Sequence, residues 1–226
     1  MNVAEAVTTR HSTRAFRDQP VSRATVKRLL EMAARSPSGG NLQPWHVYTL
    51  TGTPLTALKS RIQDKLARGE REHGDYTIYP PQLWEPLRSR RRDAGAQRYQ
   101  ALGISREMNG EGVLEEMNFN FFGAPVGLFF CVDRRVGSPQ WVDLGMFMQT
   151  LMLLAVEQGL ATCPQEIWSV WPRTVAEMVG IPDSQILFAG MPLGYEDTDS
   201  PMNSYRTTRA PLDDFASFAV FEETTP

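Results

Sequence analysis

Two arginines four positions apart, with hydroxyl side chains between them, form the first segment of the chain with the makings of a binding site. The segment is Arg10-His11-Ser12-Thr13-Arg14. Guanidinium groups bind phosphate through charge-assisted hydrogen bonds, and the hydroxyls supply further donors. A solvated basic turn has the same composition, because arginine is usually exposed. Taken alone, the segment leaves a phosphate site and a surface turn both open.

A second polar segment, Ser-Pro-Ser-Gly-Gly-Asn-Leu-Gln-Pro-Trp, occupies residues 36–45. The two glycines would let the backbone approach a ligand closely, while Ser38 and Asn41 could form hydrogen bonds to it. An ordinary connection between a helix and a strand uses the same residues. A ligand-binding loop and a plain connection are therefore equally compatible with this segment.

Most other chemistries lack their sequence patterns. The chain has no glycine-rich dinucleotide loop after a strand, no Walker A loop and no nucleophile elbow. His11, His46 and His73 lack metal-ligand spacing, and Cys131 and Cys163 do not complete a zinc site with them. We therefore expect no metal, and a reaction carried by a bound organic cofactor becomes the more plausible chemistry.

The composition sets limits on partners and compartment. The 226 residues are 42% hydrophobic, with a net charge of −3, so a full core can form and neither nucleic acid nor an anionic membrane is indicated. The longest apolar stretches, 124–132 and 144–156, are too short to span a bilayer. Two cysteines and no visible signal peptide favour reduced thiols and a cytoplasmic location.

The apolar periodicity predicts helices and strands in irregular alternation. Helices are expected at 2–9, 23–35, 54–68, 114–122, 142–159 and 172–179, and strands at 45–50, 125–132 and 185–193, with 162–167 a strand or loop. Because the segment 142–159 is mostly apolar, it should be a buried central helix whose methionines pack the core and a dimer contact. The pattern favours a layered α+β fold.

Two segments differ from the rest of a single domain that spans residues 1–226. Residues 69–112 are rich in Arg, Tyr, Pro and Gly, and we interpret them as an insert or lid that is partly helical from Leu87. Its aromatic residues Tyr76, Tyr79 and Trp84 could cover a substrate. The arginines at 88–92 suit either a solvated helix face or an anionic substrate. Residues 200–226 form a polar arm with late aromatics.

Taken together, the two polar segments closely resemble the FMN-dependent nitroreductase family. The resemblance extends over nearly the whole chain, through Asp143 and Gln149, Gly159-Leu160, Pro164-Gln165-Glu166, Gly194-Tyr195 and Arg209-Ala210-Pro211-Leu212. The insert, with Trp84-Glu85-Pro86 and the arginines at 88–92, is similar to the branch that includes nitrobenzoate reductases. The resemblance implies a central mixed, mostly antiparallel sheet flanked by helices, in an intertwined homodimer with an exchanged C-terminal arm.

The resemblance also implies a set of FMN-binding residues. Arg10, His11, Ser12 and Arg14 would line one side of the flavin, and Pro37, Ser38 and Asn41 would reach it from the other subunit. The same flavin would be contacted by Asp143, Pro164, Gln165, Glu166, Ile167, Arg206 and Arg209. Arg10, Arg206 and Arg209 would hold the phosphate, Arg14 would lie near the flavin N1 and O2, and the backbone near Glu166 would face N5. Asp143 could instead have a purely structural role on its helix. Tyr79, Trp84 and Arg88 would border the substrate.

The implied activity is NAD(P)H-dependent reduction of nitroaromatic compounds, nitrobenzoates included, by a ping-pong hydride mechanism. No side chain need act as an obligatory acid or base, because the flavin carries the redox chemistry and solvent can supply protons. Two alternatives remain: a flavin-dependent reductase of quinones or enones, and a non-catalytic binding module that uses the arginine-rich insert. Cys163, Trp168 and Trp171 are expected to be buried packing residues rather than ligands.

Overall fold

The apolar run at residues 126–133 forms the centre of a four-stranded sheet. The computed structural model describes residues 1–104 and 110–219. Its strands are β1 (His46–Thr51), β2 (Val126–Asp133), β3 (Ala161–Thr162) and β4 (Gln185–Gly194), in the order β1-β2-β4-β3. All three strand pairs are antiparallel. The parallel component among the described residues is a single isolated bridge between Ser12 and Thr162, so the mostly antiparallel sheet is confirmed.

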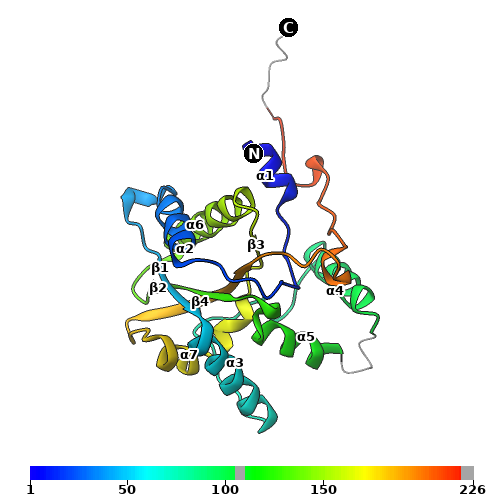
Figure 1. Cartoon of the computed structure of the whole chain (residues 1–226). Helices are drawn as coiled ribbons and strands as arrows, with labels where there is room; N and C mark the ends of the chain where they lie inside the picture. The colour runs from blue at the N-terminus through cyan, green and yellow to red at the C-terminus, as the bar shows by residue number, and fades with distance from the viewer. Residues whose placement is uncertain (105–109, 220–226) are drawn as a thin grey trace.

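Helices cover both faces of this sheet, as Figure 1 shows. On one face lie α2 (Arg23–Ala33) and α6 (Ser138–Glu157), and on the other lie α3 (Gly52–Ala67), α5 (Gly110–Phe119) and α7 (Pro172–Val179). The remaining helices lie away from the sheet: α1 (Val3–Thr9) contacts α6, and α4 (Leu87–Leu102) contacts the segment Pro201–Asn203. Short 3-10 helices occur at η1 (Gly39–Asn41), η3 (Phe121–Gly123), η4 (Glu166–Val170), η5 (Pro201–Asn203) and η6 (Leu212–Asp214). The layered α+β fold expected from the sequence is therefore present. No described helix is long and apolar enough to cross a membrane.

The alternation of side chains along β2 divides the core into two layers. Leu128 and Phe130 face α2 and α6, while Phe129 and Cys131 face the layer of α3, α5, α7 and η4. Such period-two alternation is the geometry of a strand buried on both faces. The long helix α6 is buried through Leu144, Phe147, Leu151 and their neighbours, which confirms the expected central helix. Gly159, with φ of 69°, follows its end and turns the chain into β3.

Three predicted boundaries were wrong. The helix expected at 114–122 ends at Phe119, because Phe121 and Phe122 adopt positive φ angles and enter the core, where Phe121 stacks on Trp168 at 4.4 Å. The helix expected from residue 142 begins at Ser138, where Pro139 occupies the first turn and the Gln140 side chain accepts from the Gly137 amide. The segment 162–167 is neither one strand nor a plain loop, since β3 ends at Thr162 and η4 begins at Glu166.

The start of the insert is anchored to α7 by a buried carboxylate, Glu72. Its Oε2 accepts from the Arg173 amide at 2.9 Å, its Oε1 accepts from the Thr174 hydroxyl at 2.6 Å, and Lys65 lies 3.4 Å away. Burial works to raise the pKa of Glu72, but the hydrogen bonds from Thr174, Arg173 and Lys65 outweigh it and leave the pKa below its ordinary value. A carboxylate at the start of a helix is also favoured by the helix dipole.

Replacing Glu72 by Gln should therefore lower the free energy of unfolding by about 1–3 kcal/mol at pH 7, since the charged acceptor of several hydrogen bonds is lost. A depressed folded-state pKa stabilises the protein above the unfolded value of about 4.3, and this contribution is lost as pH falls through the folded pKa. The difference between the two proteins should thus shrink below about pH 4 in urea unfolding at a series of pH values. Glu177→Gln, which removes an exposed partner of Arg61, should change stability by less than about 0.5–1 kcal/mol. A constant deficit of the Glu72 variant down to pH 2 would contradict this account.

Candidate functional site

The first predicted segment lies beside the end of the sheet, where β3 follows α6. Ser12 forms the isolated bridge with Thr162, and the Thr13 amide donates to the Thr162 carbonyl at 3.0 Å. The helix α1 that precedes the segment is capped by Asn2, whose side chain accepts from the Glu5 amide. Main-chain bonds on both sides therefore hold residues 10–14 in place and leave the arginine side chains to face other groups.

Two of the predicted phosphate ligands, Arg10 and Arg209, are near enough for their charges to interact. Burial, followed by the positive charge of Arg209, lowers the pKa of Arg10 below its usual value. Arg209 reaches this position from the C-terminal arm, where its Nη1 donates to the carbonyls of Thr207 and Thr208. Like charges repel, so the combination of Arg10 and Arg209 is complementary to an anion.

Arg14 is fixed by two arm residues that the sequence analysis did not identify, Asn203 and Tyr205. The Arg14 amide donates to Asn203 Oδ1 at 2.7 Å, and its guanidinium donates to the Tyr205 hydroxyl at 3.0 Å. Asn203 is buried and also donates to the carbonyls of Ala15 and Asp197. Nothing in the local sequence around Asn203 or Tyr205 signals this role, because it arises from contacts nearly 190 positions apart along the chain.

A further cation, Arg98 of α4, joins the same group. The charges of Arg14, Arg98 and Arg10, together with a hydrogen bond from Ser12, act on the Cys163 thiol, although burial has the largest effect and raises the pKa of that thiol. Arg98 Nε is buried and has no hydrogen-bond acceptor among the described residues. Arg98 follows Arg91 by seven positions, and so lies on the same side of α4; this spacing could have revealed it.

The four arginines Arg10, Arg14, Arg98 and Arg209 form what we call the guanidinium cluster. None of them makes an ion pair with a carboxylate of the described chain. Arg10, Arg14 and Arg98 are partly buried, whereas Arg209 is exposed. Unpaired cations at partly buried positions are costly unless an anion neutralises them. A phosphate monoester carries nearly two negative charges and several strong acceptors, so the donor set fits such a group.

Two other predicted residues are bound internally. Both ring nitrogens of His11 are occupied, Nδ1 by the Thr9 carbonyl at 3.1 Å and Nε2 by the Glu196 carboxylate at 2.9 Å. Arg206 donates to the carbonyls of Asn203 and Tyr205. His11 and Arg206 therefore hold the segments that carry the cluster, and the Arg206 guanidinium is bound to main-chain carbonyls of its own segment.

The segment from Pro164 to Ile167 is held in place by Gly190 of β4. The Gln165 amide donates to the Gly190 carbonyl at 2.8 Å, and the Gly190 amide donates back at 3.0 Å. The Gln165 side chain is equally occupied, since its nitrogen donates to Asn118 and its oxygen accepts from Trp168 Nε1 at 3.1 Å. Gln165 is therefore a positioning residue whose polar groups are all in use.

The backbone N–H groups of the next two residues, Glu166 and Ile167, are available to a ligand. No acceptor for the backbone N–H of Glu166 or Ile167 is found in the described part of the chain. The Glu166 side chain is half-buried, and burial raises the pKa of its carboxyl group. These two N–H groups are available at the position where the sequence analysis expects the flavin N5.

Gly190 leaves no room for a side chain. A Cβ added there would lie 2.2 Å from Cδ1 of Trp168, a fully buried residue that packs among Phe119, Phe121 and Phe129. Gly190→Ala should therefore displace η4 or lower the melting temperature, at a cost of about 1–3 kcal/mol. Differential scanning calorimetry of the Ala variant tests this, with Gly145→Ala as the control because a Cβ at Gly145 would meet no atom within 4 Å. Equal stability of the two variants would show that the contact with Trp168 is not restrictive.

The second predicted segment is the loop between α2 and β1, apart from the segment around Arg10. Gly40 and Asn41 adopt φ angles of 56° and 57°, and the Ser38 hydroxyl accepts from the Gln43 amide at 3.0 Å. The buried Asp143 of α6 accepts from the Gly39 amide at 3.2 Å. Asp143 is therefore a buried residue that positions the loop, and the interpretation of Asp143 as a helix-surface residue was wrong.

The candidate lid residues have different environments. Trp84 and Tyr79 are exposed, by 58% and 47%, and the Arg91 guanidinium lies 4.3 Å from the centre of the Tyr79 ring. Arg88 lies 3.2 Å from the Glu85 carboxylate. Tyr76 is instead bound to the body, since its hydroxyl donates to the Phe188 carbonyl and its ring contacts Trp141 and Phe188. Trp84 and Tyr79 are therefore free to contact a ligand, whereas Tyr76 is a packing residue.

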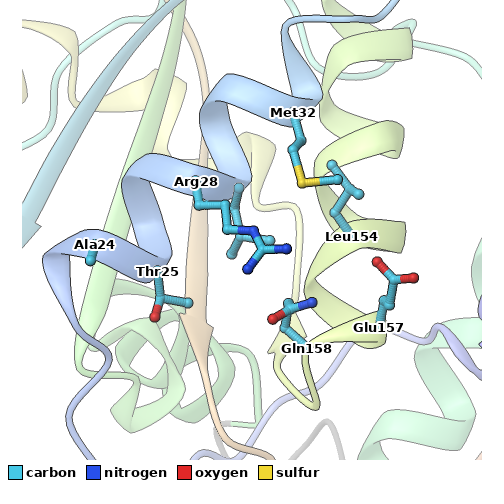
Figure 2. A pocket seen from close by; sticks show the side chains of 8 residues that line it. Ala24, Thr25, Arg28, Met32, Leu154, Glu157 and Gln158 are labelled. Atoms are coloured by element: carbon cyan, nitrogen blue, oxygen red, sulfur yellow. The ribbon is translucent and has the colours of Figure 1, made fainter.

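The residues expected to pack do so. Cys163, Trp168 and Trp171 are buried, and Met148 and Met152 lie in the core beside α2. A separate hollow of about 190 Å³ lies between α2 and α6, where Figure 2 shows Arg28, Met32 and Leu154 around it. It contains none of the predicted FMN ligands. No group of three metal-ligating side chains occurs among the described residues.

Comparisons with known proteins agree on one family. The model of the Nitroreductase family matches residues 7–195. A 4-nitrobenzoate reductase of Nocardioides sp. (strain LMS-CY) is 39% identical over 92% of this chain and 86% of its own length, and one of Pseudomonas putida is 34% identical over 96% and 95%. The crystal structure of the FMN and NADPH-dependent nitroreductase NfnB from Sphigopyxis sp. strain HMH superposes with a TM-score of 0.93 at 41% identity, covering 98% of this chain and 100% of that one.

Proposed function

Because the chain belongs to the nitroreductase family, we propose that it is an FMN-dependent reductase of nitroaromatic compounds that uses NAD(P)H. The observation that carries this proposal is the guanidinium cluster, whose arginines come from the N-terminal segment, α4 and the arm. None of them forms an ion pair with a carboxylate of the described residues. That arrangement suits the phosphate of FMN. Relatives over nearly the full length are named for the reduction of nitrobenzoate, chloronitrobenzene and nitrobenzene.

Two copies of the chain share each flavin site in this proposal. The loop of Ser38 and Asn41 is bound to Asp143 of α6, whereas Ser12 is bound to Thr162, beyond the other end of that helix. About 21 Å of helix separates Asp143 from Glu157 at 1.5 Å per residue, and Figure 1 shows α2 and α6 between the two segments. Both sets of residues line one flavin only if a second copy supplies one of them.

Exposed apolar side chains support a contact between copies. Val3, Val7, Leu42 and Val142 are exposed by 51–75% on α1, the loop after η1 and α6. The arm adds Leu212 and Phe215, exposed by 52% and 71%. Apolar groups on the elements that carry both halves of the site indicate a surface that a second copy covers. We propose that the arm from about residue 200 crosses to that copy; residues 220–226 of this arm lie outside the described part of the chain.

The overall reaction balances with two electrons per turn. A nitro group, NAD(P)H and one proton give a nitroso group, NAD(P)⁺ and water, and FMN supplies the redox chemistry by accepting two electrons from the nicotinamide and passing them to the oxidant. Arg14, held by Asn203 and Tyr205, provides a fixed positive charge that stabilises negative charge at the flavin pyrimidine. The N–H groups of Glu166 and Ile167, which have no acceptor among the described residues, would donate to the flavin near N5. Solvent provides the proton.

In this proposal the exposed Trp84 and Tyr79, with Arg88, form a lid over the aromatic oxidant. Trp84→Ala should raise KM for nitroaromatic oxidants by about three- to tenfold, since an aromatic contact contributes about 0.5–1.5 kcal/mol beyond the area that it buries. Steady-state kinetics with nitrobenzene as the varied substrate measure this. Leu87→Ala, at a partly exposed position of the same insert, is the control, and an unchanged KM in the Trp84 variant would exclude the lid role.

The test of the proposed function is a panel of turnover measurements. The purified protein should bind FMN and oxidise NADH or NADPH with 4-nitrobenzoate or nitrobenzene as acceptor. Menadione is included because quinone reduction is the alternative activity for this site. A protein that ignores added FMN, or that turns over menadione and not the nitro compounds, would overturn the proposed function.

A further inference from the structure

A groove lined by arginines lies between α4 and the segment 80–83. Its volume is about 810 Å³, within the range of small-molecule sites. One wall is formed by Pro80, Pro81 and Leu83, and the other by Arg88, Arg91, Arg92 and Arg98 of α4. None of the residues that line it is acidic. The groove is therefore strongly cationic with an apolar wall.

Two of these arginines, Arg91 and Arg98, form no ion pair with a carboxylate among the described residues. Arg88 lies 3.2 Å from Glu85 and Arg92 lies 3.1 Å from Asp93, and all four side chains are exposed, so these pairs are weak. Arg91 stacks over the Tyr79 ring, and Arg98 Nε lacks an acceptor in the described chain. A built cationic surface of this kind is complementary to several negative charges along its length.

The dimensions favour an extended ligand with several phosphates. Arg88 and Arg98 are ten residues apart on one helix, which corresponds to about 15 Å. A nitrobenzoate carries a single carboxylate that must remain within one ring width of the flavin. NADPH carries a pyrophosphate and a 2′-phosphate, about four negative charges in all, far from its nicotinamide. The groove matches the charge and length of the dinucleotide better than those of the aromatic acid.

The groove also adjoins the proposed flavin site. Arg98 lines it and, at the same time, belongs to the guanidinium cluster beside Cys163 and Tyr205. We propose that this groove binds the phosphates of NADPH and thereby makes NADPH the preferred reductant over NADH. This inference rests on the proposed function, because it needs the nicotinamide to reach a flavin in the neighbouring site.

The test measures the binding of the phosphates independently of the redox reaction. Isothermal titration of the FMN-loaded protein with adenosine 2′,5′-bisphosphate, at about 150 mM salt to screen weak surface attraction, should give saturable binding, with AMP much weaker. Arg91→Ala should weaken the bisphosphate by about tenfold or more, since a hydrogen bond to a charged group contributes about 1.5–3 kcal/mol. Arg91→Lys should retain part of the affinity. The ratio of kcat/KM for NADPH over NADH should fall in parallel in the Ala variant.

Arg90→Ala is the matched control, because Arg90 is on the same helix but faces Asp214 of the arm, 3.0 Å away. It removes the same charge and should leave bisphosphate binding within about twofold of the original. No binding of the bisphosphate to the original protein, or an equal loss in both variants, would overturn the inference. A higher KM for 4-nitrobenzoate in Arg91→Ala, with NADPH unaffected, would also overturn it and assign the groove to the aromatic acid. Failure of the protein to bind FMN would instead refute the proposed function.

Discussion

Replacing Arg10 by Ala is expected to weaken FMN binding by about 30- to 100-fold. Arg10 is half-buried, is acted on by the positive charge of Arg209 and has no carboxylate partner in the described chain. In the proposed site its guanidinium donates to the phosphate, and charge-assisted hydrogen bonds contribute about 1.5–3 kcal/mol each. Relief of the repulsion between Arg10 and Arg209 offsets only part of this loss. Quenching of flavin fluorescence on titration of the apoprotein measures the dissociation constant directly.

Arg17→Ala provides the control for the Arg10 variant. Arg17 belongs to the same N-terminal segment but is exposed, and its guanidinium donates to the Thr198 hydroxyl at 3.1 Å. It removes an equal charge from the protein, so any general electrostatic effect on a negatively charged ligand appears in both variants. If the two variants lose FMN affinity equally, the phosphate is not held where the guanidinium cluster lies.

A mixed dimer of two variants that each bind FMN poorly is expected to regain one of its two flavin sites. Arg10→Ala damages the guanidinium cluster, and Ser38→Trp places an indole in the loop held by Asp143. If each site combines the cluster of one copy with the loop of the other, a mixed dimer holds one intact site and one doubly damaged site. Co-expression with two different affinity tags isolates the mixed dimer, and its bound FMN is counted by absorbance.

The FMN content of the mixed dimer distinguishes a flavin site shared between two copies from a flavin site formed by a single chain. Dimers of either variant alone should hold little FMN, whereas the mixed dimer should hold one FMN per two chains. Size-exclusion chromatography with light scattering shows whether each variant still forms the dimer. A mixed dimer as empty as its parents, with both variants dimeric and folded, would refute the shared site.

The sequence was sufficient for the fold because its strongest signals are local. The apolar run that forms β2 and the apolar helix α6 can be recognised from their local hydrophobic patterns, and Gly159 marks the end of that helix. The end of α5 was missed because Phe121 and Phe122 take positive φ angles, and Phe121 stacks on Trp168 in the core. No propensity argument predicts such a conformation for phenylalanine.

The candidate site was only partly predictable for a related reason. The motifs around Arg10 and Ser38 are contiguous, so they can be recognised in the sequence. Asn203, Tyr205 and Arg98 act on Arg14 and Cys163 from distant elements, which only the folded chain brings together. The structure also shows that the polar groups of Gln165 are already occupied. The glutamine at this position of the motif therefore holds η4 against β4.

The central claim is that a cluster of arginines binds the phosphate of the flavin, and a comparison of FMN with riboflavin tests it most directly. The two ligands share the isoalloxazine and ribityl groups and differ in the phosphate alone. Titration of the apoprotein should show riboflavin binding at least about 100-fold more weakly than FMN, as expected for the loss of two or more charge-assisted hydrogen bonds. Equal affinity for the two ligands would contradict the account.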